Sequence, residues 1–235
     1  MLYLYAIAKN RRGLSVAGPG IRGAAVEILP LRKIVAVASL LDSHDVAVTE
    51  ANLWRHEQVI ARVMEEAAVI PLRFGTVVDE WARCRRRLSE CYRPLTTRLT
   101  LLSNRVEFAV RLVGGTVEDE PTQTEVSDVP PGPGTAYLRS LAKAHSGWPG
   151  WLGTALRRAI DPQAVASTLW PRDSSSQDLR ASFLVNRSET DVFCDAVAAF
   201  QAEWPGIRLS CTGPWPPYTF ANEPFTPLSD EKRHS

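Results

Sequence analysis

The chain has 235 residues, 45% of them hydrophobic and 23% charged, and a formal net charge of +1. This composition is typical of globular proteins and excludes wholesale disorder, and the length allows one large domain or two small ones. The charge balance argues against a protein that mainly binds nucleic acid or an anionic membrane. Four scattered cysteines are too few for a disulfide framework. No apolar run approaches the roughly 20 residues of a membrane span and no signal peptide pattern opens the chain, so we expect a soluble, cytoplasmic protein.

The first hundred residues have the pattern of several strands combined with two helices. We expect strands over residues 3–8, 25–29, 34–39 and 69–74, with a hairpin around Pro30 between the second and the third. Apolar residues at three- and four-residue steps predict a helix over 49–68 that buries Leu53 and His56. A second such stripe predicts a helix from a cap at Asp79 to Leu102, broken or kinked near Tyr92 by the proline at position 94.

The rest of the chain predicts a second α+β unit. We expect strands over 107–113, 164–170, 180–186 and 207–211, and helices over 135–145, 151–160 and 188–204, the last begun by a capping box of Ser188 and Asp191. From Glu107 onward this is the chain order of a ferredoxin-like βαββαβ unit. The predicted fold class is therefore α+β with two domains: an N-terminal α+β domain over 1–103 and a ferredoxin-like domain over 104–222. The latter contains a mobile insertion over 114–134, and a flexible tail follows over 223–235.

The motifs that would signal catalysis or cofactor binding have simpler explanations. Residues 18–23 match G-x-G-x-x-G, but a strand follows them where a dinucleotide site needs a helix, so we interpret them as a turn. The cysteines lack zinc spacing, and Cys84 and Cys91 suit the core. His56 lies on a buried helix face, where a hydrogen-bonded core histidine is expected. We therefore predict no catalytic residue, no metal, no cofactor and no enzymatic activity.

Two other groups of residues leave alternatives open. Five arginines on the exposed sides of the second helix form either a solvated face paired with nearby acids or a docking site for an acidic partner: Arg83, Arg85, Arg86, Arg87 and Arg93. Three tryptophans near a Pro-Gly turn are either lids on the core or an exposed contact surface: Trp148, Trp151 and Trp170.

Four segments, in order along nearly the whole chain, carry a resemblance to one family. They are Tyr3-Leu4-Tyr5-Ala6-Ile7; His56 with the Val69–Thr76 segment VIPLRFGT; Gly134-Thr135-Ala136-Tyr137-Leu138; and the Gly213–Phe220 segment GPWPPYTF. Together they resemble the gas vesicle proteins F and L (GvpF/GvpL).

The resemblance implies a two-domain fold and a non-enzymatic role as a minor structural or assembly component of the gas vesicle. It implies contact with the small, very hydrophobic shell subunit GvpA, and with other gas vesicle accessory proteins, at the gas-facing side or at assembly sites in the cytoplasm. No nucleic acid, membrane or small molecule is expected as a partner. The alternative is a small-ligand-binding or catalytic domain built on the ferredoxin-like sheet.

The residues that carry the family motifs are His56, Pro71, Leu72, Arg73, Phe74, Gly75, Tyr137, Gly213, Pro214, Trp215, Pro217 and Tyr218. The prolines and glycines among them have a structural interpretation, because they fix backbone turns. Arg73 is expected to pair with an acid such as Glu57, and the aromatic residues can pack their rings while satisfying a polar tip.

Overall fold

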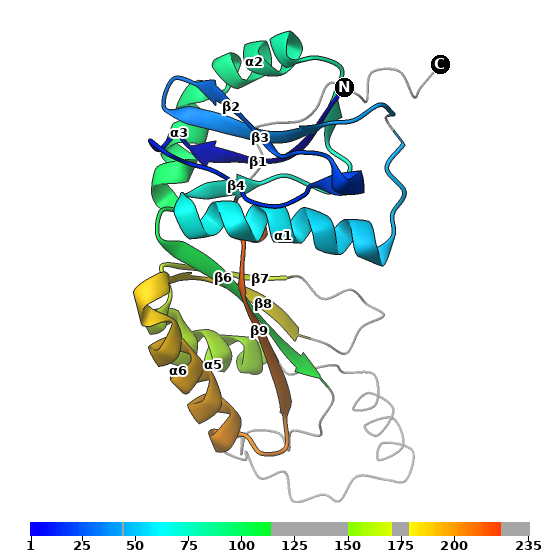
Figure 1. Ribbon diagram of the computed structural model, residues 1–235. Helices are drawn as coiled ribbons and strands as arrows, with labels where there is room; N and C mark the ends of the chain where they lie inside the picture. The colour runs from blue at the N-terminus through cyan, green and yellow to red at the C-terminus, as the bar shows by residue number, and fades with distance from the viewer. Residues whose placement is uncertain (44, 114–149, 171–178, 222–235) are drawn as a thin grey trace, which may run out of the picture. The chain divides into compact units, whose positions relative to one another are not determined.

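The computed structural model describes residues 1–43, 45–113, 150–170 and 179–221 (Figure 1). It forms two compact units, one made of Met1–Glu107 with the segment that begins at Pro214, the other of Phe108–Gly213. Within the described residues the fold is mixed α/β, with two antiparallel sheets and six α-helices. The predicted insertion over 114–134, the predicted helix over 135–145 with Tyr137, and the tail lie outside the described residues.

The sheet of the first unit is built around the N-terminal strand. Its strands are β1 (Leu2–Lys9), β2 (Glu27–Leu31), β3 (Ile34–Leu40), β4 (Val69–Pro71) and β5 (Val77–Val78), in the order β2-β3-β1-β4 with β5 also paired to β1. All of these pairings are antiparallel. Seven of the eight residues of β1 are buried, which explains its continuous apolar and aromatic sequence.

A bulge interrupts β1 at Tyr5. The register with β3 shifts between Leu4, which faces Ala38, and Ala6, which faces Val37, so Tyr5 is an extra residue in the strand. Such a bulge re-aims the side chain that it carries. Tyr3 and Tyr5 thereby belong to the same buried cluster, which also contains Val59, Ile60 and Val63 of the first helix.

The hairpin between β2 and β3 differs from its predicted form. Pro30 lies inside β2, opposite Val35, and not in the connection. This is possible because β2 is an edge strand, where proline's missing N–H removes no ladder hydrogen bond. The turn consists of Arg32 and Lys33, and Arg32 has a left-handed φ of +56°.

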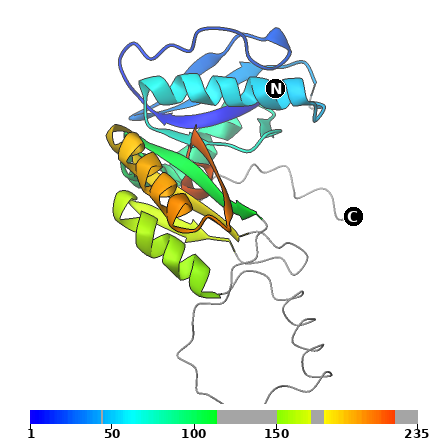
Figure 2. The same cartoon turned by 90° about the horizontal axis from the view of Figure 1, so that it is seen from below.

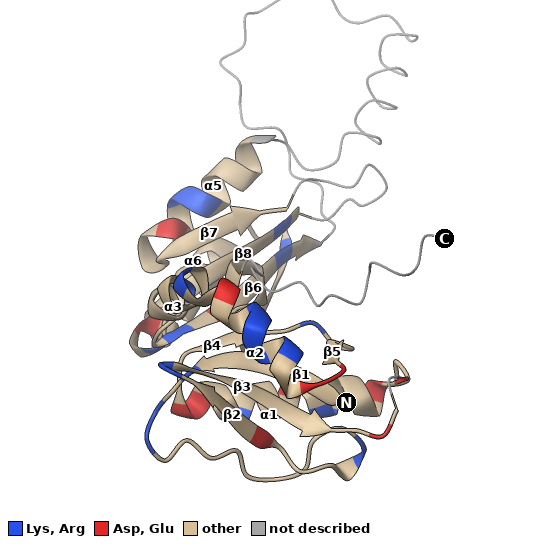
Figure 3. Cartoon of the chain, turned by 90° about the horizontal axis from the view of Figure 1, so that it is seen from above, with Lys and Arg blue, Asp and Glu red and all other residues tan. Residues whose placement is uncertain are grey.

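Three helices pack on this sheet. Helix α1 (Glu50–Glu66) covers one face, while α2 (Trp81–Glu90) and α3 (Tyr92–Leu101) lie on the opposite face (Figures 1 and 3). The buried side chains of α1 begin at His56, so Leu53, expected on the buried face, is 41% exposed in the first turn. The Thr49 hydroxyl caps α1 by accepting from the Asn52 N–H.

The predicted interruption between α2 and α3 is present. Helix α2 ends at Glu90, Cys91 leaves helical geometry with ψ +12°, and α3 begins at Tyr92. The predicted cap of α2 is wrong: the N-cap is Glu80, without a side-chain hydrogen bond. Asp79 instead forms an ion pair of 2.7 Å with Arg83, four residues on.

The sheet of the second unit has the order β7-β8-β6-β9. Its strands are β6 (Arg105–Val113), β7 (Ala166–Leu169), β8 (Leu179–Asn186) and β9 (Arg208–Trp215). Helices α5 (Gly150–Ile160) and α6 (Thr190–Glu203) pack against each other on one side of it (Figures 1 and 2). Its core includes three stacked phenylalanines, Phe108, Phe183 and Phe193.

Short helical turns complete the described chain. They are η1 (Ile21–Gly23), η2 (Asp161–Gln163), η3 (Arg187–Glu189) and α7 (Tyr218–Ala221). Ser188 lies inside η3 and the N-cap of α6 is Glu189, without a side-chain bond, so the predicted capping box is wrong. The two compact units divide after Glu107 and again after Gly213, so α7 belongs to the first unit. The domain limits predicted from the sequence, at 103 and 222, stay a prediction.

Candidate functional site

The second of the four family segments, His56 with Val69–Thr76, joins α1 to β4 and the turn that follows it. His56, 1% exposed, lies in this helix, and Pro71 ends β4 opposite Ala6 of β1. Leu72 is also buried, and its N–H donates to the Tyr5 carbonyl at 2.9 Å. Gly75 turns the chain toward β5 with φ +82°, in the left-handed region that favours glycine.

A chain of three hydrogen bonds links this motif to β1 through His56. The His56 Nε2 atom lies 2.9 Å from the Leu72 carbonyl oxygen, which can only accept, so Nε2 carries the hydrogen. His56 Nδ1 is then an acceptor, and the Tyr3 hydroxyl donates to it at 2.9 Å. The Tyr3 oxygen in turn accepts from the Gly75 N–H at 3.2 Å. The neighbours thus select one neutral tautomer of the imidazole.

The same side chains form a closed group of rings. The centroid of the His56 ring lies 5.7 Å from that of Tyr3, 5.6 Å from that of Tyr5 and 5.7 Å from that of Phe74. The Tyr3 and Tyr5 centroids are 5.0 Å apart. Tilted and edge contacts at these separations are favourable aromatic geometries, so the rings stabilise one another's packing.

A second branch of polar contacts starts at Tyr5. Its hydroxyl donates to Ser39 Oγ at 2.9 Å and accepts from the Ile21 N–H at 2.7 Å. The Ser39 hydroxyl donates in turn to the Ala25 carbonyl at 2.8 Å. A methyl group on Gly20 would overlap the Tyr5 hydroxyl and lie 2.5 Å from Ser39 Oγ. Residues 18–23 therefore form a turn, as predicted, and Gly20 is the glycine that lets this turn approach Tyr5.

Burial sets the protonation of these groups. Desolvation lowers the pKa of His56 to about 4, although the hydrogen bond to the Leu72 carbonyl opposes the shift. Desolvation also raises the pKa of both tyrosines above the ordinary value. All three side chains are neutral near pH 7, and each has its polar atoms engaged with protein neighbours. The arrangement suits a rigid core rather than proton transfer to a substrate.

The C-terminal family motif returns to the same helix. Gly213, Pro214 and Trp215 end β9, and the buried Pro217 leads into α7. The Tyr218 hydroxyl donates to Glu57 Oε1 at 2.5 Å. Burial raises the pKa of Glu57 and the bond from Tyr218 opposes that shift. The predicted pair of Arg73 with Glu57 stays a prediction, and the exposed Arg73 uses its carbonyl to accept from the Thr76 hydroxyl at 2.7 Å.

Two further contacts fix α7. Thr219 donates to the Glu107 carboxylate through its N–H at 2.8 Å and through its hydroxyl at 2.5 Å. The Arg98 guanidinium donates to the Phe220 carbonyl at 3.2 Å. The structure therefore brings His56, the 71–75 segment and Tyr218 to adjacent positions of α1.

Sequence reasoning did not single out Tyr3, Tyr5, Ser39, Glu107 or Thr219 as partners in these contacts. The available signal was polarity at buried positions. Two tyrosines in an otherwise apolar strand require hydrogen-bond partners once the strand is buried, and so does a glutamate within a core strand.

The structure describes part of the two groups for which the sequence left alternatives open, and a docking role for the five arginines stays a prediction. Two of the arginines on α2 are paired with acids of the same region, Arg83 with Asp79 at 2.7 Å and Arg87 with Glu90 at 3.1 Å. Trp151 packs on Trp204 with 5.2 Å between centroids, Trp170 is 50% exposed, and Trp148 lies outside the described residues. Over the described parts of the chain, no group of His, Cys, Asp or Glu is placed to hold a metal ion, and no helix is long and apolar enough to cross a membrane.

Comparison with known proteins identifies the family. The family model described as gas vesicle synthesis protein GvpL/GvpF matches residues 1–222. Gas vesicle protein L of Streptomyces sp. (strain CB03234) is 28% identical, over 93% of this chain and 92% of that protein. Gas vesicle protein F1 of Halobacterium salinarum is 25% identical, over 94% and 92%. The crystal structure of GvpF from Anabaena sp. PCC7120 shares the fold, with a TM-score of 0.75 at 20% identity over 94% of this chain and 96% of that one. The chain belongs to the GvpL/GvpF family of gas vesicle synthesis proteins.

Proposed function

We propose that this protein takes part in gas vesicle formation as a minor structural or assembly component that binds the shell subunit GvpA. The family match over residues 1–222 carries the proposal. The internal use of the motif side chains supports it, because His56, Tyr3 and Tyr218 hold the fold together. Its expected place is the gas-facing side of the vesicle or its assembly sites in the cytoplasm, where other accessory proteins are further candidate partners.

A group of exposed apolar residues that lie close together in the sequence, here called the apolar cluster, supports binding to a very hydrophobic subunit. Of the nine large apolar side chains that are exposed among the described residues, four lie within the short stretch from the end of β3 to the second turn of α1: Leu40, Val48, Leu53 and Trp54. Trp54 is 61% exposed and Val48 77%. Several exposed large apolar residues within 15 positions of the chain are typical of contact sites in soluble domains.

The test is co-purification with GvpA. We expect the tagged chain, co-expressed with a GvpA shell subunit, to retain that subunit through affinity and size-exclusion steps. The double variant Val48→Ser/Trp54→Ser should lose most of the retained GvpA, while Val192→Ser, which removes a 51% exposed valine from α6, should not. A wild-type chain that retains no GvpA contradicts the proposal, and equal retention by both variants contradicts the assignment of the surface.

We also infer that the second unit is a ferredoxin-like domain within residues 104–222. The sheet order β7-β8-β6-β9 supports this, because it is the order in which the four strands of a βαββαβ unit pair. The positions of α5 after β6 and of α6 after β8 agree with it. Secondary structure and topology from an experimental structure of residues 104–222 in the full chain would test both the topology and the limits.

A further inference from the structure

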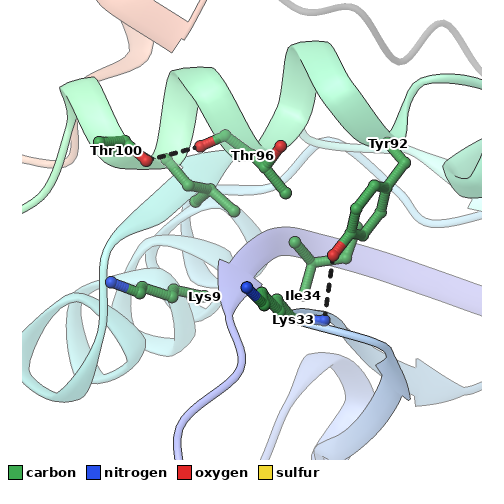
Figure 4. Close-up of a pocket in the computed structure, with 7 residues that line it drawn as sticks. Lys9, Lys33, Ile34, Tyr92, Thr96 and Thr100 are labelled. Atoms are coloured by element: carbon green, nitrogen blue, oxygen red, sulfur yellow. Dashed lines mark hydrogen bonds between the residues drawn. The ribbon is translucent and has the colours of Figure 1, made fainter.

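A cavity of about 530 Å³ opens beside α3, and none of its lining residues belongs to the family motifs or to the apolar cluster (Figure 4). It is lined by Lys9, Lys33, Ile34, Tyr92, Thr96, Leu99 and Thr100, all of the first unit. The lysines lie on the strand side, and Tyr92 and the two threonines project from α3 (Figure 4). Its volume is in the range of sites that hold small ligands or a few side chains.

The lining is positively charged. Two of the four lysines of the chain contribute to it, whereas none of the seven lining residues is acidic. A third cation lies close, because the Arg32 guanidinium is 5.1 Å from the centroid of the Tyr92 ring. The cavity therefore selects for an anion.

The backbone holds the cations in place. Lys9 ends β1, and its Cα partner Ile34 begins β3. Asn10, which follows Lys9, binds the turn between β2 and β3. Its N–H donates to the Lys33 carbonyl at 2.8 Å and its side-chain amide donates to the Arg32 carbonyl at 2.9 Å. The lysine side chains thus come from two adjacent, mutually bonded strand ends.

The wall on α3 offers a donor and two acceptors. The Tyr92 hydroxyl accepts from the Lys33 N–H at 3.3 Å, and its own hydrogen has no acceptor among the described residues. The hydroxyls of Thr96 and Thr100 donate to the carbonyls of Arg93 and Thr96, both at 2.9 Å. Because both hydroxyl hydrogens are used in this way, the threonine oxygens can only accept a hydrogen bond from a ligand. This suits a molecule that carries N–H groups as well as negative charge.

The floor of the cavity is apolar. Ile34 is fully buried and Leu99 is 2% exposed. The lysines, by contrast, are exposed, and an exposed ion pair alone contributes at most about 1 kcal/mol because solvent screens it. A small free anion would gain little here, so the fitting ligand adds an apolar group to its charge.

From these features we infer that the cavity binds an acidic segment of a partner protein. A glutamate or aspartate carboxylate contacts Lys9 and Lys33, an apolar neighbour covers Ile34 and Leu99, and peptide N–H groups meet the threonine oxygens. The inference goes beyond the binding of GvpA and uses none of the residues of the apolar cluster, so either can fail while the other stands.

The test uses a short fluorescein-labelled peptide of alternating glutamate and leucine, with fluorescence anisotropy on the full chain. We expect binding that weakens with added salt, and that weakens about tenfold at low salt in the double variant Lys9→Gln/Lys33→Gln. The matched variant Arg158→Gln/Arg208→Gln removes two exposed charges from the second unit and should bind like wild type. Tyr92→Phe, which keeps the ring beside Arg32, should weaken binding about threefold.

Further arms separate the ligand classes. The same peptide with glutamine for glutamate should lose binding, and alanine for leucine should weaken it. Peptide addition should shift the amide resonances of Ile34, Tyr92 and Thr96. The inference is overturned if the double lysine variant binds the peptide like wild type, if the shifts occur elsewhere, or if inorganic phosphate or free glutamate competes at the concentration of the peptide, which would indicate a free-anion site.

Discussion

The imidazole of His56 is bound in a way that only its neutral form permits. Nε2 donates to the Leu72 carbonyl and Nδ1 accepts from the Tyr3 hydroxyl. Protonation would place a second hydrogen on Nδ1, facing the Tyr3 oxygen, and the Tyr3 hydrogen would lose its acceptor. Burial of the charge is what lowers the pKa of His56 to about 4, and the hydrogen bond to the Leu72 carbonyl opposes the shift.

The pKa of His56 predicts a dependence of stability on pH. The unfolded histidine has a pKa near 6.5, so between pH 6.5 and pH 4 the unfolded chain binds a proton that the folded chain does not. The His56 contribution is therefore fully present above pH 6.5 and is lost as the pH falls toward 4, by about 3 kcal/mol in total. Urea unfolding of wild type and His56→Gln between pH 4 and 8 measures it, because the variant lacks the titrating group and the carboxylates cancel in the difference. A wild-type-minus-variant difference that stays constant over this range would contradict the prediction.

Gly20 is required by the Tyr5 hydroxyl. With φ −88° the backbone of Gly20 accepts any residue, so the demand is purely steric. Gly20→Ala is expected to destabilise the fold by about 2–4 kcal/mol, because the methyl group displaces Tyr5 from Ser39 and Ile21 and leaves buried polar atoms unpaired. Thermal and urea unfolding would measure the loss. Gly153→Ala is the control: its methyl group meets nothing nearer than 3.7 Å inside α5, so it should be neutral or stabilise by up to about 1 kcal/mol.

Single residues also show what the sequence can predict about the site. The helical period places His56 on the buried face of α1, and the motif glycine and prolines are found at turns and strand ends. Periodicity reports the face on which a residue lies, but not the atoms that it meets there. The contacts of Tyr3 and of Tyr218 join positions 53 and 161 residues apart, and no local pattern encodes them.

At the scale of elements, the strands and helices follow from periodicity, and the differences have local causes. The break at Cys91 was predicted because proline disfavours the preceding helical turn. The bulge at Tyr5 and the position of Pro30 inside an edge strand depend on which strands pair, which one sequence does not reveal. The exposure of Leu53 depends on where the packed part of α1 begins, which is also a tertiary property.

Helix α7 depends on its side-chain anchors. With four residues it is too short to form by itself, and the Thr219 contacts with the Glu107 carboxylate tie it to the first unit. Thr219→Val keeps the shape of the side chain and removes the hydroxyl donor to a carboxylate that is 6% exposed. We expect a loss of about 1–3 kcal/mol in urea unfolding, with faster hydrogen exchange of the backbone amide at position 219. Thr97→Val, on the exposed face of α3, is the control and should change stability by less than about 0.5 kcal/mol. Equal effects of the two substitutions would mean that the anchor contributes nothing.

At the scale of the whole molecule, the described chain contains two cores. The first unit buries the cluster around Tyr3, Tyr5 and α1, and the second buries the phenylalanines around Phe183. The units divide inside β6 and β9, so two strands pass from one to the other. Separate cores favour separate unfolding steps, and the cysteines provide a probe in each unit.

The cysteines should distinguish these steps by their reactivity. Burial raises the pKa of Cys84, in the first unit, to about 12, and that of Cys211, in the second, to about 11. Because the thiolate is the reactive form, both should resist a thiol reagent near pH 8 in the native protein, and the exposed Cys194 should react first. Brief labelling across a urea gradient, read by mass spectrometry of peptides, is expected to give different midpoints for Cys84 and Cys211, since each becomes reactive when its own core opens. If the units unfold independently, a variant of one unit should shift only the midpoint of the cysteine in that unit. Gly20→Ala should therefore lower the urea midpoint of Cys84 labelling and leave the midpoint of Cys211 labelling unchanged. Coincident midpoints that move together in this variant would show that the two units unfold as one.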